Sequence, residues 1–129
     1  MIMKKLIVLL LFILVSIVGF MMKLPNVFRD YDKELHLLFY LAACVFLSIL
    51  FASRNYFYHI AILGALFCFG VFIECCQEAS NSFVSKRIHG NFDIEDVIFN
   101  TVGLFLAFFI WTSFVIIKLI IKEVKIWLQ

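Results

Sequence analysis

Residues 97–117 read VIFNTVGLFLAFFIWTSFVII, an apolar run of 21 residues that contains no charged side chain. A helix of that length rises about 30 Å, which is the thickness of the hydrocarbon core of a bilayer. Three further apolar blocks of similar length precede it, at 6–22, 35–53 and 60–77. The sequence therefore predicts an all-α, polytopic membrane protein built as an antiparallel bundle of four transmembrane helices.

The composition supports the same fold class. Of the 129 residues, 65% are hydrophobic and 16% are charged, whereas about a quarter of a soluble domain is normally charged. So few charges do not cover a globule, and the length fits a single domain over 1–129. The Lys and Arg side chains form no basic stripe, so we expect the lipid bilayer as a partner and no nucleic acid.

The two ends of the chain flank the first and last spans with positive charge. Lys4 and Lys5 precede the first block, which also resembles a signal peptide, but no Ala-x-Ala-like site follows and we expect a retained helix. Residues 118–129 continue the last block as an interfacial amphipathic tail, with Lys118, Lys122 and Lys125 on one face. This charge distribution predicts that both termini are cytoplasmic.

Several other side chains are expected to play packing or surface roles. The seventeen phenylalanines would face lipid, while His59 and His89 lie in connectors and would be surface residues. Gly103 would allow two helices to approach closely. Free cysteines behave as small apolar groups, so we expect reduced packing residues and no metal site from the four of them, which are Cys44, Cys68, Cys75 and Cys76.

Acidic residues gather at one end of the predicted bundle. Eight of the nine lie at the start of the second helix, the end of the third or the start of the fourth, and these three places share one side of the membrane. Ionisable groups within a span cost at least a few kcal/mol, so they normally face the bundle and pair. Desolvation would disfavour the charge of Glu74 unless Lys33, His36 or Arg87 compensates it. The candidate cluster from these places consists of Asp32, Lys33, His36, Glu74, Gln77, Asp96 and Asn100.

The spacing within each place puts polar residues on a shared helix face. Residues four apart lie one turn apart, and three pairs have this spacing. Asp96 is in addition a candidate N-cap of the fourth helix. The three pairs are Asp32 with His36, Glu74 with Glu78, and Asp96 with Asn100.

The order of these motifs resembles the VanZ-like family. The motifs are Asp32-Lys33-x-x-His36-x-x-x-Tyr40, Glu74-x-x-Gln77 and Asp96-x-x-x-Asn100-x-x-Gly103, spread over roughly residues 30–107. The family usually carries an arginine about six residues before the helix-four aspartate. Here Gly90 holds that position and Arg87 lies nine before Asp96, so Arg87 joins the candidate cluster as the residue that would take the role. The resemblance implies a multi-pass protein of a bacterial cytoplasmic membrane, in a family with a member linked to teicoplanin resistance.

The function that we expect of the polar cluster is ligand binding, and the resemblance suggests the kind of ligand. We expect the cluster to bind a lipid-linked or other cell-envelope ligand near the outer leaflet, with no metal and no cofactor. One alternative is a membrane-embedded enzyme, with His36 as a base and Glu74 as an acid, or with a cation held by His36, Glu74, Glu78 and Asp96. No H-E-x-x-H, G-x-S-x-G or paired-glutamate motif supports it. The other alternative is a structural or interaction protein whose polar network has no ligand.

Overall fold

The computed structural model describes residues 2–22, 26–52, 55–83 and 92–128. Every regular element in these ranges is helical, and four helical segments are long and apolar enough to cross a membrane. The predicted fold class is therefore confirmed. The elements are α1 (Ile2–Met21), the 3-10 helix η1 (Asn26–Tyr31), α2 (Asp32–Leu47), the π-helix η2 (Ser48–Ala52), α3 (Tyr56–Phe83) and α4 (Ile94–Trp127).

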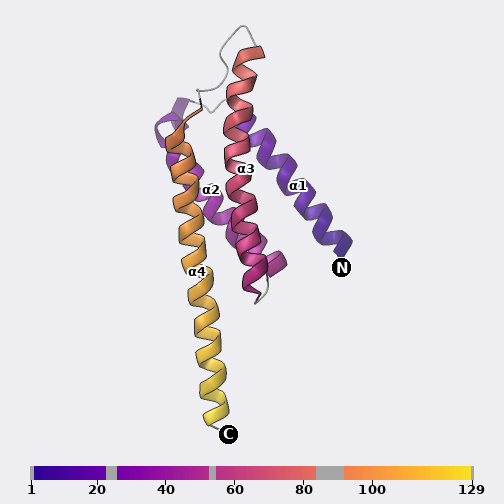
Figure 1. Cartoon of the computed structure of the whole chain (residues 1–129), viewed down its shortest axis with the longest axis vertical. Coiled ribbons are helices and arrows are strands. Elements are labelled where there is room, and N and C mark those ends of the chain that lie inside the picture. Colours follow the sequence, from indigo (N-terminus) through magenta and orange to yellow (C-terminus); the bar gives the residue numbers. More distant parts are fainter. Residues whose placement is uncertain (1, 23–25, 53–54, 84–91, 129) are drawn as a thin grey trace.

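The long helices run in alternating directions (Figure 1). The first turns of α2 and α4 lie beside the last turns of α3, and we call this the polar end of the bundle. Both chain termini lie away from it (Figure 1). The main helix pairing is that of α2 with α4, and α3 packs against both, while α1 contacts α3. The chain thus brings three separate sequence regions to one end.

The α2–α4 pairing is close because small residues lie along it. Ala43 and Cys44 of α2 share the buried core with Leu104 and Ala107 of α4. A Cβ atom added at Gly103 would meet the backbone carbonyl oxygen of Leu37 and would lie 3.1 Å from the backbone nitrogen of Leu41. The two backbones therefore touch at Gly103, as the sequence predicted.

The helices are longer than the apolar blocks that predict them. Because α3 begins at Tyr56, most of the expected connector at 54–59 is helical. The tail at 118–129 continues α4 without a break to Trp127, and its side chains are exposed. The phenylalanines do not all face outward as expected, since Phe12, Phe20 and Phe39 pack against the core. Phe20 and Phe39 meet edge to face, with ring centroids 4.8 Å apart.

Candidate functional site

A buried histidine–asparagine hydrogen bond joins α2 to α4 at the polar end. His36 is only 5% exposed, and its Nδ1 lies 2.9 Å from Oδ1 of Asn100, which is also buried. An amide oxygen can only accept a hydrogen bond, so Nδ1 of His36 carries a proton and donates it. This bond leaves Nε2 of the same ring facing the end of the bundle.

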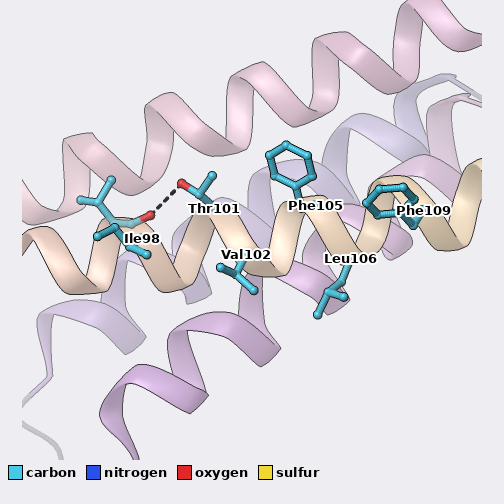
Figure 2. A pocket seen from close by; sticks show the side chains of 7 residues that line it. Ile98, Thr101, Val102, Phe105, Leu106 and Phe109 are labelled. Atoms are coloured by element: carbon cyan, nitrogen blue, oxygen red, sulfur yellow. Dashed lines mark hydrogen bonds between the residues drawn. The ribbon is translucent and has the colours of Figure 1, made fainter.

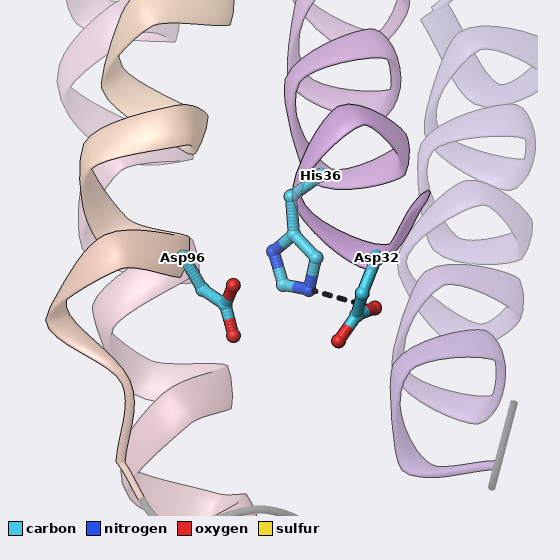
Figure 3. Close-up of side chains that lie close together, drawn as sticks. All are labelled: Asp32, His36 and Asp96. Carbon is cyan, nitrogen blue, oxygen red and sulfur yellow. Dashed lines mark ion pairs between the residues drawn. The ribbon is translucent and has the colours of Figure 1, made fainter. Parts of the chain in front are cut away.

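The ring of His36 lies between two aspartates, and Asp32 is beside that second ring nitrogen (Figure 3). Asp32 precedes His36 by one turn of α2, and Asp96 precedes Asn100 by one turn of α4. Oδ1 of Asp32 lies 3.9 Å from Nε2 of His36. One donor atom from each of Asp32, His36 and Asp96 lies within 4.8 Å of the other two. The i, i+4 spacing on two neighbouring helices therefore builds a compact set of one imidazole and two carboxylates.

Near this set, two buried oxygens have no hydrogen-bond partner among the described residues. Glu74 is 1% exposed, and its Oε2 accepts a hydrogen bond from the backbone nitrogen of Asp93 at 3.3 Å. Its Oε1 has no hydrogen-bond partner among the described residues, and neither does the hydroxyl of Tyr40, which is 0% exposed. A Cβ atom at Gly70 would lie 3.0 Å from both Asn100 Nδ2 and the Tyr40 hydroxyl oxygen. Tyr40, Gly70 and Asn100 are thus immediate neighbours.

Neither Tyr40 nor Gly70 was predicted as a site residue. A signal for both was present in their spacing, since Tyr40 follows His36 by one turn and Gly70 precedes Glu74 by one turn. Gly70 leaves the space in which the Asn100 amide and the Tyr40 hydroxyl come together, because a larger residue would fill it.

The segment that leads into α4 is held by α3. Glu78 accepts a hydrogen bond from the backbone nitrogen of Phe92 at 2.9 Å, one turn beyond the bond between Glu74 and Asp93. Asp93 caps α4, because its side chain accepts from the backbone nitrogen of Glu95 at 2.8 Å. The expectation that Asp96 caps this helix is therefore wrong. Glu78 is exposed and engaged with the backbone, so the structure does not gather the four-residue cation set that the sequence suggested.

The other predicted site residues lie apart from this set. Lys33 forms an ion pair with Glu95 at the surface, so it is not the ionic partner of Glu74. Gln77 donates from Nε2 to the backbone oxygen of Phe20 at 2.9 Å and thereby ties α3 to α1. Arg87 lies outside the described residues. The structure thus brings Asp32, His36, Asp96 and Asn100 together, with Glu74 behind them.

The match to known families covers all four helices. The family model described as VanZ/LLP1 matches residues 7–118. The chain belongs to the VanZ/LLP1 family. No curated protein and no solved structure matches it. The match extends well beyond the region at 30–107 that carries the polar motifs, so α1 and most of α4 belong to the VanZ-like domain.

An apolar surface groove of this VanZ-like protein is not part of the site. It is apolar and runs along the exposed face of α4, as Figure 2 shows. Asp96 and Asn100 lie on the opposite, buried face of the same helix. Exposed apolar side chains on a transmembrane helix contact lipid, and we assign the groove to the surrounding bilayer. Its lining residues are Val97, Ile98, Thr101, Val102, Phe105, Leu106 and Phe109.

His59 was expected at the surface, and this expectation is wrong. The residue is 0% exposed within α3, and its Nδ1 lies 2.7 Å from Oγ of Ser48 in the π-helix. Its ring stacks on Trp111 with centroids 4.2 Å apart and an angle of 11° between the planes. Although a serine–histidine pair resembles a nucleophile and its base, both side chains are fully buried, so the contact serves packing between η2, α3 and α4.

Proposed function

We propose that this VanZ-like protein binds the polar headgroup of a lipid-linked cell-envelope component at the polar end of its bundle. One observation carries the proposal. Glu74 Oε1 and the Tyr40 hydroxyl are deeply buried, next to His36 and Asn100, and have no partner among the described residues. A buried polar group without a hydrogen bond costs about 1–3 kcal/mol.

Half-satisfied polar networks are less stable than apolar packing, so a ligand that supplied the missing hydrogen bonds would stabilise this network. Replacing the Tyr40 hydroxyl by hydrogen would remove its cost without breaking any described bond. The retention of such oxygens at one end of the bundle, beside the open set of Asp32, His36 and Asp96, favours a ligand that completes the network.

The chemistry of the cluster selects the kind of headgroup. Carboxylate oxygens accept hydrogen bonds, and the cluster offers them from Asp32, Asp96 and Glu74. A headgroup rich in hydroxyl donors, such as the sugar portion of a lipid-linked envelope component, would supply the missing donors. Its lipid chain would remain in the bilayer around the helices.

The proposed location is a bacterial cytoplasmic membrane, with both termini in the cytoplasm and the polar end facing outward. Positive charges favour the cytoplasmic side of a span. Lys4 and Lys5 begin the first span, and Lys118, Lys122 and Lys125 end the last one. Both groups lie on α1 and α4 away from the polar end, so this orientation presents the cluster to envelope precursors (Figure 1).

The proposal is tested by native mass spectrometry of protein extracted from its own membranes in mild detergent. We expect the wild type to retain an envelope lipid whose mass identifies it, and Asp96→Asn and Glu74→Gln to lose it at least tenfold. Glu34→Gln is the control, because Glu34 is exposed on the same end of α2. Equal retention by all four proteins, or no retained envelope lipid in the wild type, would overturn the proposal in favour of a structural network.

A further inference from the structure

Three donor atoms at the polar end have the composition of a metal site. Asp32 and Asp96 each offer a carboxylate oxygen and His36 offers a ring nitrogen, with all three atoms within 4.8 Å of one another (Figure 3). An imidazole with carboxylates suits divalent first-row metals such as Mn²⁺ and Zn²⁺. Three protein ligands leave coordination positions open.

The hydrogen bond to Asn100 prepares His36 for this role. Histidines that bind metal normally donate their other ring N–H to a second group, which sets the tautomer and the ring orientation. Here Nδ1 donates to Asn100 Oδ1 at 2.9 Å, so Nε2, which lies near the Asp32 carboxylate, is the nitrogen left free to bind a metal. The separation of Nε2 from Asp32 Oδ1 is 3.9 Å, which is too long for a hydrogen bond and short enough for two ligands of one ion.

The charges around His36 also favour a cation. Glu74, nearly fully buried, lies close enough to interact electrostatically with both His36 and Asp96. Within the ranges that the structure describes, Lys33 pairs with Glu95 and acts on Asp96 only electrostatically, and no Lys or Arg forms an ion pair with Asp32, Asp96 or Glu74. Buried carboxylates without a counter-charge are costly. A divalent ion between the helices would supply that charge.

We propose that Asp32, His36 and Asp96 bind one divalent cation of the Mn²⁺ or Zn²⁺ type, with Asn100 as the positioning residue for His36. Ligand atoms about 2.0–2.2 Å from one ion lie at most about 4.4 Å apart. A small rotation of the half-exposed Asp32 side chain would close the set. The open coordination positions would face a phosphate or hydroxyl oxygen of the headgroup. This contact with the headgroup rests on the proposed function, whereas cation binding itself does not.

The test is a titration of purified, chelator-treated protein with Mn²⁺ alone. Binding is measured as the decrease of the free Mn²⁺ signal in electron paramagnetic resonance. Mn²⁺ is chosen because the chain has free cysteines, which would compete for Zn²⁺. We expect one bound ion per chain. Asn100→Ala should weaken its binding by about 10–100-fold, as loss of a second-layer partner usually does. Asp32→Asn and Asp96→Asn should weaken it at least as much, and the control Asp30→Asn should not change it.

Asp32→Asn keeps the result interpretable if a buried variant fails to fold, because the Asp32 side chain is only partly buried. The proposal is overturned if the wild type binds no Mn²⁺. That result is expected if a proton on Nε2 of His36, rather than a metal, holds the aspartates. It is also overturned if Asp32→Asn binds as tightly as the wild type. The titration contains no lipid. If the protein binds no Mn²⁺ but retains lipid normally, only the cation proposal is wrong. If the protein binds the cation but retains no lipid, only the proposed function is wrong.

Discussion

Replacement of Gly103 by alanine tests whether the polar end depends on direct contact between α2 and α4. In an open helical position, Gly→Ala stabilises a helix by up to about 1 kcal/mol. At Gly103 the new Cβ would meet the Leu37 carbonyl oxygen and the Leu41 nitrogen. Both are backbone atoms within α2, so the contact is relieved only if the helices move apart, and overpacking of this kind costs about 1–3 kcal/mol.

The matched control is Gly64→Ala, because a Cβ atom at Gly64 in α3 would have nothing within 4 Å. We expect the free energy of unfolding of Gly103→Ala to fall about 1–3 kcal/mol below that of Gly64→Ala, because both variants share the gain in helix propensity and only Gly103→Ala carries the overpacking cost. The measurement is reversible unfolding in mixed micelles of mild detergent and SDS. If Gly103→Ala is as stable as Gly64→Ala, the close α2–α4 contact is wrong, and with it the basis for the geometry at His36 and Asn100.

Three further results are expected. In a cysteine-free background, a membrane-impermeant thiol reagent added to intact cells should label Val27→Cys and not Leu128→Cys; the reverse pattern would invert the topology. His59→Leu should lower the free energy of unfolding by about 1–3 kcal/mol, because it leaves the Ser48 hydroxyl without its partner. The double variant with Ser48→Ala should lose less, and equal losses would contradict the coupling between His59 and Ser48. Lys33→Met should change the free energy of unfolding by less than about 1 kcal/mol, because its ion pair is partly exposed, and a larger loss would assign Lys33 a second partner.

The fold followed from the sequence because bilayer-length apolar runs leave few alternatives, and residues 97–117 contain no charge to disrupt the last span. The convergence of Asp32, His36, Asp96 and Asn100 followed from two i, i+4 pairs, one at the start of α2 and one at the start of α4. In a bundle whose helices alternate in direction, these two helices begin on the same side. Spacing along one helix does not reveal partners on another. This is why Lys33 was one of three candidate counter-charges for Glu74 when its partner is Glu95, and why the bond from Gln77 to the Phe20 carbonyl was missed.

The error at His59 has a different cause. A histidine directly before an apolar block, preceded by Arg, Asn and Tyr, has the composition of a connector. Tertiary structure overrides that composition, since Ser48 supplies a hydrogen-bond partner and Trp111 a stacking surface within the bundle. The π-helix that carries Ser48 has no sequence signal comparable to a cap or a proline, so it was not predicted.

The most direct test of ligand binding at the polar end is Tyr40→Phe, measured for stability and for retained envelope lipid in the same preparation. The Tyr40 hydroxyl has no described partner, so its removal should leave the free energy of unfolding unchanged or raise it by up to about 1–3 kcal/mol. If a ligand completes the network, the variant should nevertheless retain at least tenfold less lipid than the wild type. The control Tyr58→Phe, at an exposed position, should match the wild type in both measurements. A Tyr40→Phe protein that is stable and retains as much lipid as the wild type would contradict the account.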